Sequence, residues 1–235
     1  MPGNTDGAHK IAVLRPGAQV EGEFISRPNR FLGIVKIDGR EELVHIHDPG
    51  RLEELLYNGN RVLVKRAEGP RRKTSWSLIA ASYENQWIFT NSGYHRQISE
   101  NLMNFLFAGA DIRAEVRIGH SRLDFVVKNG DACTGVEIKG CTLTEDGKAL
   151  FPDAPTERGR KHIETLVEMM DEGCGAVLVV LVFRKDSRCF APNRRTDPAF
   201  ARALENAVKK GLSVRPMLME YDGETVWWTG EIGLC

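Results

Sequence analysis

Short segments in which apolar and polar residues alternate fill the first ninety residues of the chain. Alternation with a period of two is typical of half-buried β-strands, and turn residues separate the segments. The expected strands are 20–25, 32–37, 42–46, 61–65, 75–81 and 86–89. A brief helix is expected at 49–56, because Asp48 and Pro49 stand where a helix begins. This order predicts a small Greek-key barrel of the OB type.

Helical spacing replaces this alternation after residue 91. The apolar positions predict a helix over 93–107 and a second helix marked by Ile163, Leu166, Val167 and Met170. A third helix should begin after Thr196 or Asp197, with Pro198 in its first turn, and end before Gly211. The expected strands are 112–118, 122–128, 177–183, 213–220 and 224–228. We therefore predict a mixed α/β protein with a barrel domain over 1–90 and an α/β domain over 91–235.

A β-hairpin is expected where Asn129 and Gly130 interrupt two apolar segments, since Asn-Gly is the strongest signal for a two-residue hairpin loop. In that register Asp124 faces Gly135, and Glu137 faces Arg122. One side of the hairpin then carries the apolar residues Leu123, Phe125, Val127, Val136 and Ile138. The other side carries Asp124, Gly135, Glu137 and Lys139, and the glycine places no side chain between the two carboxylates.

Two carboxylates on neighbouring strands predict a site for Mg²⁺ or Mn²⁺, because hard cations prefer oxygen ligands. Asp124 and Glu137 are the expected ligands, and the carbonyl of Ile138 is a further candidate. A bound cation polarises a phosphoryl oxygen and activates water, while Lys139 is suited to position that water or to stabilise the developing charge. The same alternation is typical of any solvated sheet face, so spacing alone leaves catalysis as a hypothesis.

Longer motifs carry a more specific resemblance. The segments SRLDF, VEIKGCTL and FPDAPTERGRKHIETL, preceded by NRFLGIVKIDG, VHIHDPGRL and TNSGYHRQI, resemble the sugar fermentation stimulation protein family. The resemblance implies an N-terminal OB barrel joined to a restriction-endonuclease-like domain of the PD-(D/E)xK type. It also implies DNA binding with little sequence preference and a regulatory role in sugar use. The family's nuclease-like motif maps onto Asp124, Glu137 and Lys139.

Two positions depart from the family pattern, Gly140, where a small hydroxyl residue is expected, and His47, where a proline is expected. Neither replaces a candidate ligand. The resemblance leaves two interpretations open: a metal-dependent nuclease, or a non-catalytic DNA-binding regulator of sugar (maltose) metabolism genes. A module that binds other proteins is a third and weaker hypothesis.

Basic residues cluster on one barrel strand and the loop after it, interrupted by Glu68. The cluster consists of Arg61, Lys65, Arg66, Arg71, Arg72 and Lys73. OB folds bind oligonucleotides with such loops, so DNA, with RNA as an alternative, is the expected partner, held through its phosphate backbone. A solvated charged loop is the competing interpretation. Phe31, Tyr57 and Trp76 are aromatic residues that either stack on bases or belong to the barrel core.

The start of the second helix adds Arg158, Lys161 and His162, which can meet a phosphate or complete the metal site. Glu100 and Glu115 are further acidic candidates. His45 and His47 share a strand face, but no third ligand stands at a recognisable spacing. Motifs of zinc proteases, P-loop NTPases and dinucleotide enzymes are absent from the sequence.

Composition limits the remaining choices. The 32 basic and 32 acidic residues give a net charge of zero, so local patches must hold any nucleic acid. No apolar run approaches the roughly 20 residues that span a bilayer, and the start does not resemble a signal peptide. The five cysteines are odd in number and form no C-x-x-C pair. We therefore expect no disulfides and no zinc ribbon. The expected compartment is the reducing cytoplasm. The sequence does not predict the oligomeric state.

Overall fold

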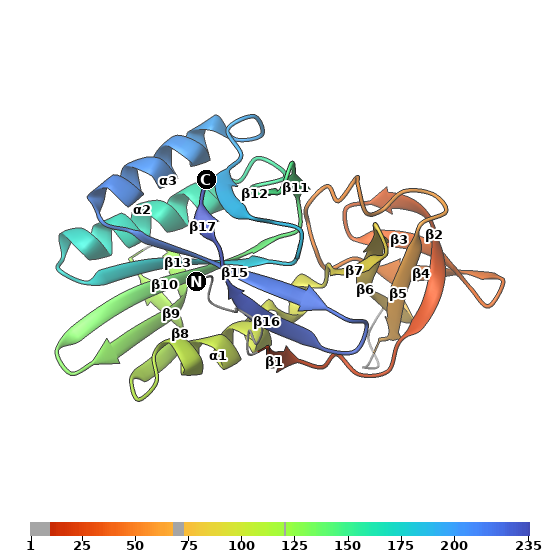
Figure 1. Ribbon diagram of the computed structural model, residues 1–235, viewed down its shortest axis with the longest axis horizontal. Coiled ribbons are helices and arrows are strands. Elements are labelled where there is room, and N and C mark those ends of the chain that lie inside the picture. Colours follow the sequence, from red (N-terminus) through yellow and green to blue (C-terminus); the bar gives the residue numbers. More distant parts are fainter. Residues whose placement is uncertain (1–9, 68–72, 120) are drawn as a thin grey trace, which may run out of the picture.

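A five-stranded barrel forms the N-terminal part of the computed structural model, which describes residues 10–67, 73–119 and 121–235 (Figure 1). Its strands are β2 (Val20–Asn29), β3 (Leu32–Ile37), β4 (Arg40–His45), β5 (Arg61–Arg66) and β6 (Trp76–Tyr83). They pair in the order β4-β3-β2-β5-β6, and a short parallel pairing of β4 with β6 closes the barrel. The expected OB barrel is confirmed.

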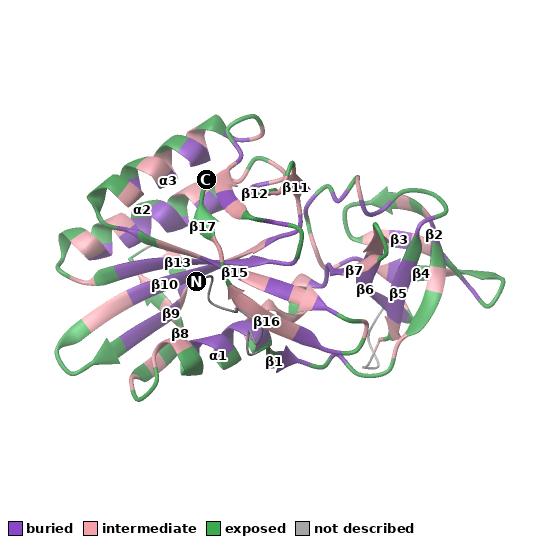
Figure 2. Ribbon diagram, in the orientation of Figure 1, coloured by how far each residue is buried: buried purple, intermediate pink, exposed green. Residues whose placement is uncertain are grey.

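A mixed sheet with helices on both faces forms the rest of the chain. Its elements are α1 (His95–Leu106), which follows the short helix η1 (Ser92–Tyr94), β8 (Asp111–Ile118), β9 (Ser121–Asn129), β10 (Ala132–Cys141), α2 (Glu157–Asp171), β13 (Gly175–Val182), α3 (Pro198–Lys210), β15 (Ser213–Tyr221) and β16 (Val226–Glu231). α2 and α3 cover one face and α1 the other (Figure 1). Figure 2 shows the buried strands between them. The predicted mixed α/β fold is confirmed.

The centre of this sheet follows its sequence closely. β13 pairs in parallel with β10 and β15, and every residue of Ala176–Val182 is buried. This confirms that an unbroken apolar segment marks a strand covered on both faces. α3 begins and ends as expected, because Asp197 accepts a hydrogen bond from the Phe200 amide (2.9 Å) and Gly211 has a left-handed backbone, φ 114°.

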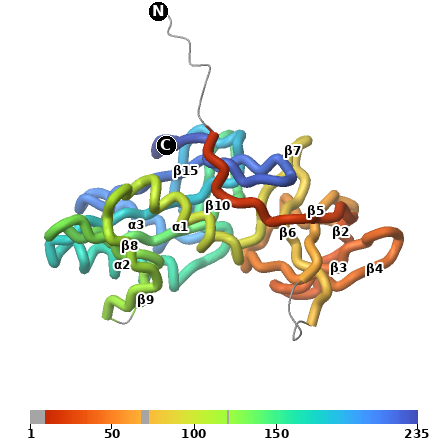
Figure 3. The backbone as a smooth tube through the Cα atoms, turned by 90° about the horizontal axis from the view of Figure 1, so that it is seen from below, coloured from red at the N-terminus to blue at the C-terminus, as the bar shows by residue number. Residues whose placement is uncertain are grey.

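One hydrogen-bonded sheet runs through both parts of the chain. β7 (Gln86–Phe89) pairs with barrel strand β6 and, at Trp87–Tyr221, with β15. Figures 1 and 3 show the barrel at one end and the helices at the other. Short strands that the sequence did not predict complete the structure: β1 (Ile11–Leu14), β11 (Thr144–Glu145), β12 (Lys148–Phe151), β14 (Cys189–Pro192) and β17 (Gly233–Leu234). None of the helices in the described ranges has the length and apolar composition that a membrane span requires.

The expected helix at 49–56 is wrong, because that segment forms an irregular loop with one tight turn. The Arg27 guanidinium donates to the carbonyls of Asp48 (3.1 Å), Gly50 (2.8 Å) and Arg51. These carbonyls bind a side chain instead of amides further along the chain, and Leu52 has φ 53°, outside the helical region. The loop instead contacts the second part of the chain, where the Arg51 amide donates to Asp153 Oδ2 (2.9 Å).

The prediction of unpaired cysteines is also wrong. Cys133, at the start of β10, bonds to Cys174, just before β13, and Cys189 on β14 bonds to Cys235. Cys141 is free and buried. The bonded pairs are 41 and 46 residues apart, and strand pairing brings them together, so no spacing motif announces them. The argument from cysteine content for a reducing compartment therefore fails.

The first disulfide should contribute measurably to stability. Replacing Cys133 and Cys174 together by serine should lower the free energy of unfolding by about 3 to 4 kcal/mol, the loop-closure entropy of a 41-residue separation. Urea unfolding without reductant measures the loss. Both proteins in this comparison carry Cys189→Ser and Cys235→Ser, which remove the second disulfide. With reductant, the two proteins should unfold at the same urea concentration. Equal stability without reductant would contradict the Cys133–Cys174 bond.

Stability should also depend on pH through Asp48. Burial raises the pKa of this carboxyl to about 6, and the negative charge of Asp153 acts in the same direction. The folded state therefore binds the proton more tightly than the unfolded state, so stability falls as pH rises through about 6. Asp48→Asn should raise the free energy of unfolding at pH 8 by up to about 3 kcal/mol and change it little at pH 4. A gain of equal size at both pH values would contradict this assignment.

Candidate metal centre

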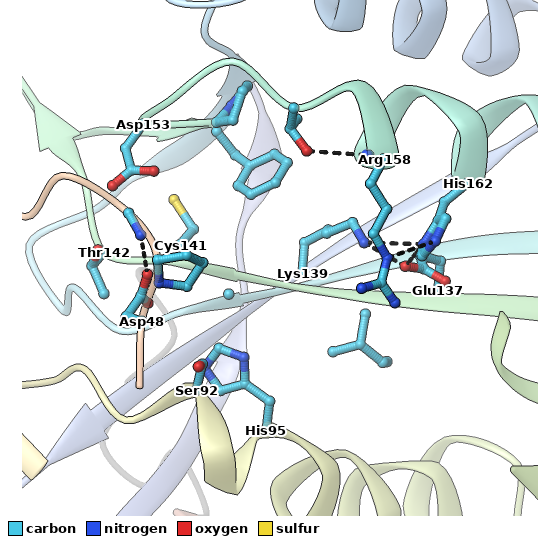
Figure 4. A pocket seen from close by; sticks show the side chains of 18 of the residues that line it. Asp48, Ser92, His95, Glu137, Lys139, Cys141, Thr142, Asp153, Arg158 and His162 are labelled. Carbon is cyan, nitrogen blue, oxygen red and sulfur yellow. Dashed lines mark hydrogen bonds and ion pairs between the residues drawn. The ribbon is translucent and has the colours of Figure 1, made fainter. Parts of the chain in front are cut away.

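A cleft of about 700 Å³ lies between the barrel and the α/β part. Arg30 and Asp48 line it from the barrel, and His95 and Arg96 from α1. The remaining walls come from η1, β8, β9, β10, the segment that leads into α2, and the first turns of α2. Figure 4 shows polar side chains at two ends of this pocket. Glu137, Lys139, Arg158 and His162 converge at one end, and Asp48 and Asp153 lie at the other.

The hairpin that carries the motif is confirmed, but its predicted register is wrong. The loop residues are Gly130 and Asp131, and Asn129 pairs with Ala132. Of the loop residues only Gly130 has a positive φ, 59°, which suits a type II′ turn with glycine first. Gly135 therefore pairs with Val126 instead of facing Asp124. Its missing side chain makes room for Met169 of α2, whose Sδ would lie 2.6 Å from a Cβ at this position.

The two strands of the hairpin lose their regular pairing where the motif begins. The last registered pair is Phe125–Val136, and beyond it the Ile138 amide donates to Asp124 Oδ2 at 2.8 Å. A side-chain carboxylate thus takes the place of a backbone acceptor. On the neighbouring strand Glu115 has φ 56° and interrupts the pairing of β8 with β9. Leu123 packs on the α2 side, not with Phe125 as predicted.

Glu137 is the most buried charged group of the site, with a side chain 1% exposed. Lys139 Nζ and His162 Nδ1 both contact its Oε1 atom. Its other oxygen, Oε2, is buried and has no hydrogen-bond partner. A buried carboxylate oxygen without a partner is costly, and a bound cation would satisfy it.

The two carboxylates have pKa values shifted in opposite directions. Burial raises the pKa of Asp124, and the nearby charge of Glu137 adds to that shift. Burial also acts to raise the pKa of Glu137, but the hydrogen bond from His162 and the charge of Lys139 outweigh it and lower this pKa. Glu137 is therefore ionised over the physiological range, and its negative charge disfavours the ionisation of Asp124.

Helix α2 brings His162 to Glu137. Its start is fixed by Thr156, whose hydroxyl accepts the Gly159 amide (3.0 Å) and whose amide donates to Asp197 Oδ2 (2.9 Å). We assign the proton to His162 Nδ1, which donates it to Glu137, because Nε2 accepts from Arg158 Nε at 3.4 Å. Arg158 and His162 both line the cleft. The structure thus brings two of the three residues named at this helix start into the site.

The third of them, Lys161, does not line the cleft. Its side chain is 61% exposed and pairs with Glu157 at 2.9 Å. Of the two acidic candidates, Glu115 lines the cleft and pairs with Arg96 and Arg122. Glu100 is exposed and pairs with Arg96 alone among the described residues.

The basic cluster of the barrel is divided by the structure. Arg61, at the start of β5, binds both carboxylate oxygens of Glu21 (2.6 and 2.9 Å). Lys65 and Arg66, at the other end of this strand, line a second pocket of about 250 Å³. Lys73 is exposed. Arg71 and Arg72 lie outside the described residues.

Sequence reasoning missed the role of His95. Its ring occupies the space beside Gly140, where a Cβ would lie 2.2 Å from His95 Cε1, and it stacks on Phe183. Burial and the charge of Lys139 lower the pKa of His95 to about 4, so a neutral imidazole forms this wall of the cleft. Gly140, which departs from the family pattern, thus makes room for the His95 ring on α1. Neither position alone signals this contact in the sequence, because the two residues belong to different elements.

The donor set suits a hard divalent cation. Among the described residues, no group of three His, Cys, Asp or Glu side chains is arranged to hold a metal ion, and the candidate centre contains two carboxylates. Asp124 and the Oε2 atom of Glu137 offer oxygen ligands. Mg²⁺ is commonly bound by one or two carboxylates together with waters and phosphate oxygens. The residues present therefore fit this ion.

Comparison with known proteins identifies the family. The family models described as "SfsA N-terminal OB domain" and "Sugar fermentation stimulation protein RE domain" match residues 25–90 and 89–225. The sugar fermentation stimulation protein homolog of Thermotoga petrophila is 45% identical over 218 residues, which cover 93% of this chain and 96% of that protein. The homolog of Methanococcoides burtonii is 43% identical over 227 residues and 92% of each chain.

A solved structure agrees with this assignment. It is described as that of Pyrococcus furiosus SfsA in complex with Ca²⁺, and it superposes with a TM-score of 0.88 at 27% sequence identity. The match covers 96% of this chain and 99% of the other. The barrel lies mainly within the match at 25–90, and the α/β part mainly within the match at 89–225. The chain therefore belongs to the sugar fermentation stimulation protein family.

Proposed function

We propose that this protein is a nuclease that hydrolyses phosphodiester bonds with the help of Mg²⁺ or Mn²⁺. The observation that supports this most directly is the buried Oε2 atom of Glu137, which has no hydrogen-bond partner. The related structure from Pyrococcus furiosus is described as a complex with Ca²⁺. Ca²⁺ prefers oxygen ligands as Mg²⁺ does, so that description supports cation binding in the family.

Each residue of the centre has a role in this proposal. Asp124 and Glu137 would hold the cation, with the carbonyl of Ile138 as a further ligand. A bound cation supplies Lewis acidity, which polarises a phosphoryl oxygen and activates water. Lys139 supplies a positive charge at the place where negative charge develops on phosphorus oxygens. His162 holds Glu137 in position through Oε1, while Oε2 has no hydrogen-bond donor.

The substrate would be DNA, with RNA as the alternative, held mainly through phosphates. Arg158 supports this, because it lines the cleft at the N-terminus of α2, where a helix already favours anions. Within the described residues its guanidinium forms no ion pair with a carboxylate, and its one hydrogen bond is to His162. It is therefore available for a phosphate next to the metal centre.

A regulator of sugar metabolism genes that binds DNA without cutting it is the second candidate. It is favoured by the family's name and by the three-way contact among Glu137, Lys139 and His162, which satisfies Oε1 without a cation. In that case DNA binding would not depend on divalent cations or on Asp124.

Cleavage assays separate the two candidates. Purified protein incubated with plasmid, single-stranded DNA and RNA should cut at least one of them with Mg²⁺ or Mn²⁺ and none with EDTA. Asp124→Asn, Glu137→Gln and Lys139→Met should each reduce the cleavage rate by about 100-fold or more. Lys161→Met and Glu164→Gln are matched controls on the exposed side of α2 and should keep the full rate.

Cleavage that persists in both Asp124→Asn and Lys139→Met would contradict the proposed centre and indicate a contaminant or another site. No cleavage by the wild-type protein, together with DNA binding that is indifferent to EDTA, would support the regulator instead. Circular dichroism of each variant excludes loss of folding as the cause.

A further inference from the structure

Three rings form a continuous aromatic surface on the barrel. Phe31, in the turn between β2 and β3, stacks on His45 of β4 with ring centroids 6.4 Å apart and planes inclined by 23°. His45 in turn contacts His47 edge to face, at 4.3 Å. Phe31 is 48% exposed. We call Phe31, His45 and His47 the aromatic surface.

The backbone holds Phe31 in this exposed position. Its amide donates to Asn29 Oδ1 at 2.9 Å, and its carbonyl accepts the Ile46 amide at 3.0 Å. The ring is therefore presented to solvent by a fixed backbone and does not belong to a loose loop. Leaving a large apolar ring half-exposed forgoes hydrophobic stabilisation, and an exposed, ordered aromatic residue of this kind is typical of a binding surface.

The aromatic surface connects the cleft to the second pocket. Arg30, the neighbour of Phe31, lines the cleft with the metal centre. His47, at the other end, lines the second pocket together with Lys65 and Arg66. The Ser92 hydroxyl, which belongs to the cleft wall, donates to the His47 carbonyl at 2.8 Å and ties the two regions together.

Positive charge lies at both ends of the aromatic surface. Arg66 rests over the Trp76 ring at 4.4 Å and forms no ion pair with another described residue. Trp76 itself is 7% exposed, so it supports Arg66 and does not face solvent. Arg30 is exposed and likewise pairs with no carboxylate of the described chain. This arrangement of cations on either side of aromatic rings suits a single-stranded nucleic acid, whose phosphates bind cations and whose bases stack on rings.

We propose that the aromatic surface binds unpaired bases of a single-stranded nucleic acid, whose backbone continues into the cleft. This inference rests on the proposed function and specifies its substrate class. Bases within a duplex are covered on both faces by their neighbours, so an exposed ring finds no free π-face there. Phe31 and His45 would each stack on a base, while Arg66 and Arg30 would contact the phosphates on either side.

Binding measured without cleavage tests the proposal. Fluorescence anisotropy in EDTA compares an oligo(dT) strand, an oligo(U) strand of equal length and a duplex of equal length. The wild-type protein should prefer the single strands, and Phe31→Ala should weaken their binding by about 5- to 150-fold, the measured range for one stacked base. Phe31→Trp should restore it. Phe105→Ala is the matched control, because Phe105 is a 59% exposed phenylalanine on α1 whose ring contacts Trp228 and not the aromatic surface.

The dependence on salt distinguishes stacking from charge. Arg66→Ala should reduce the slope of log affinity against log salt concentration by about 0.7, the value for one phosphate contact to a single strand. Phe31→Ala should leave that slope unchanged. Tighter binding of the duplex than of both single strands would overturn the proposal, as would full single-strand affinity in Phe31→Ala.

Failure of this proposal and failure of the proposed function give different results. If Phe31→Ala binds single strands normally and the wild-type protein still cuts nucleic acid with Mg²⁺, the metal centre stands and the aromatic surface does not. If no cleavage occurs but Phe31→Ala loses single-strand binding, the aromatic surface binds nucleic acid for a purpose other than hydrolysis.

Discussion

The burial of one carboxylate, that of Glu137, places the strongest demand on this structure. A charge with only 1% exposure costs several kcal/mol of desolvation unless partners compensate it. Lys139 and His162 compensate Oε1, and nothing among the described residues compensates Oε2. A protein gains no stability from such a half-satisfied group. Under the proposed function, a cation shared with the neighbouring carboxylate of Asp124 would satisfy this oxygen.

Several features of the fold follow from positioning this group. Asp124 accepts a hydrogen bond from the Ile138 amide at the point where the regular pairing of the hairpin ends. Both carboxylates lie in this part of the hairpin, beyond the last paired residues. α2 must begin at a fixed place so that His162 reaches Glu137. Asp197 provides that constraint, because one oxygen binds the Thr156 amide before α2 and the other begins α3. The barrel then closes the cleft from the opposite side.

The sequence was informative wherever a local pattern decides the structure. The unbroken apolar segment of β13, the alternating barrel strands and the start of α3 at Asp197 followed from periodicity and capping preferences. The association of Asp124, Glu137 and Lys139 in one cleft followed from the hairpin, even though its register did not. Asn129 and Gly130 gave the expected turn signal, but the structure places the loop one residue later, at Gly130 and Asp131.

Features that depend on distant contacts were not predictable. Arg27 binds the carbonyls that a helix at 49–56 would need. Leu123 lies on the opposite face from Phe125, next to the place where Glu115, with its positive φ, leaves the β8–β9 pairing. Cys133 lies next to Cys174 because β10 pairs with β13. Hydrophobic periodicity and short motifs do not reveal such contacts, since each contact joins segments that are remote in sequence.

A crystal soaked in Mn²⁺ and measured at the manganese absorption edge tests the central claim most directly. The account predicts an anomalous peak within about 2.2 Å of Glu137 Oε2 and of an Asp124 oxygen, and its disappearance from crystals of Glu137→Gln. A cleft without a peak at saturating Mn²⁺, or a peak confined to Asp48 and Asp153, would contradict it.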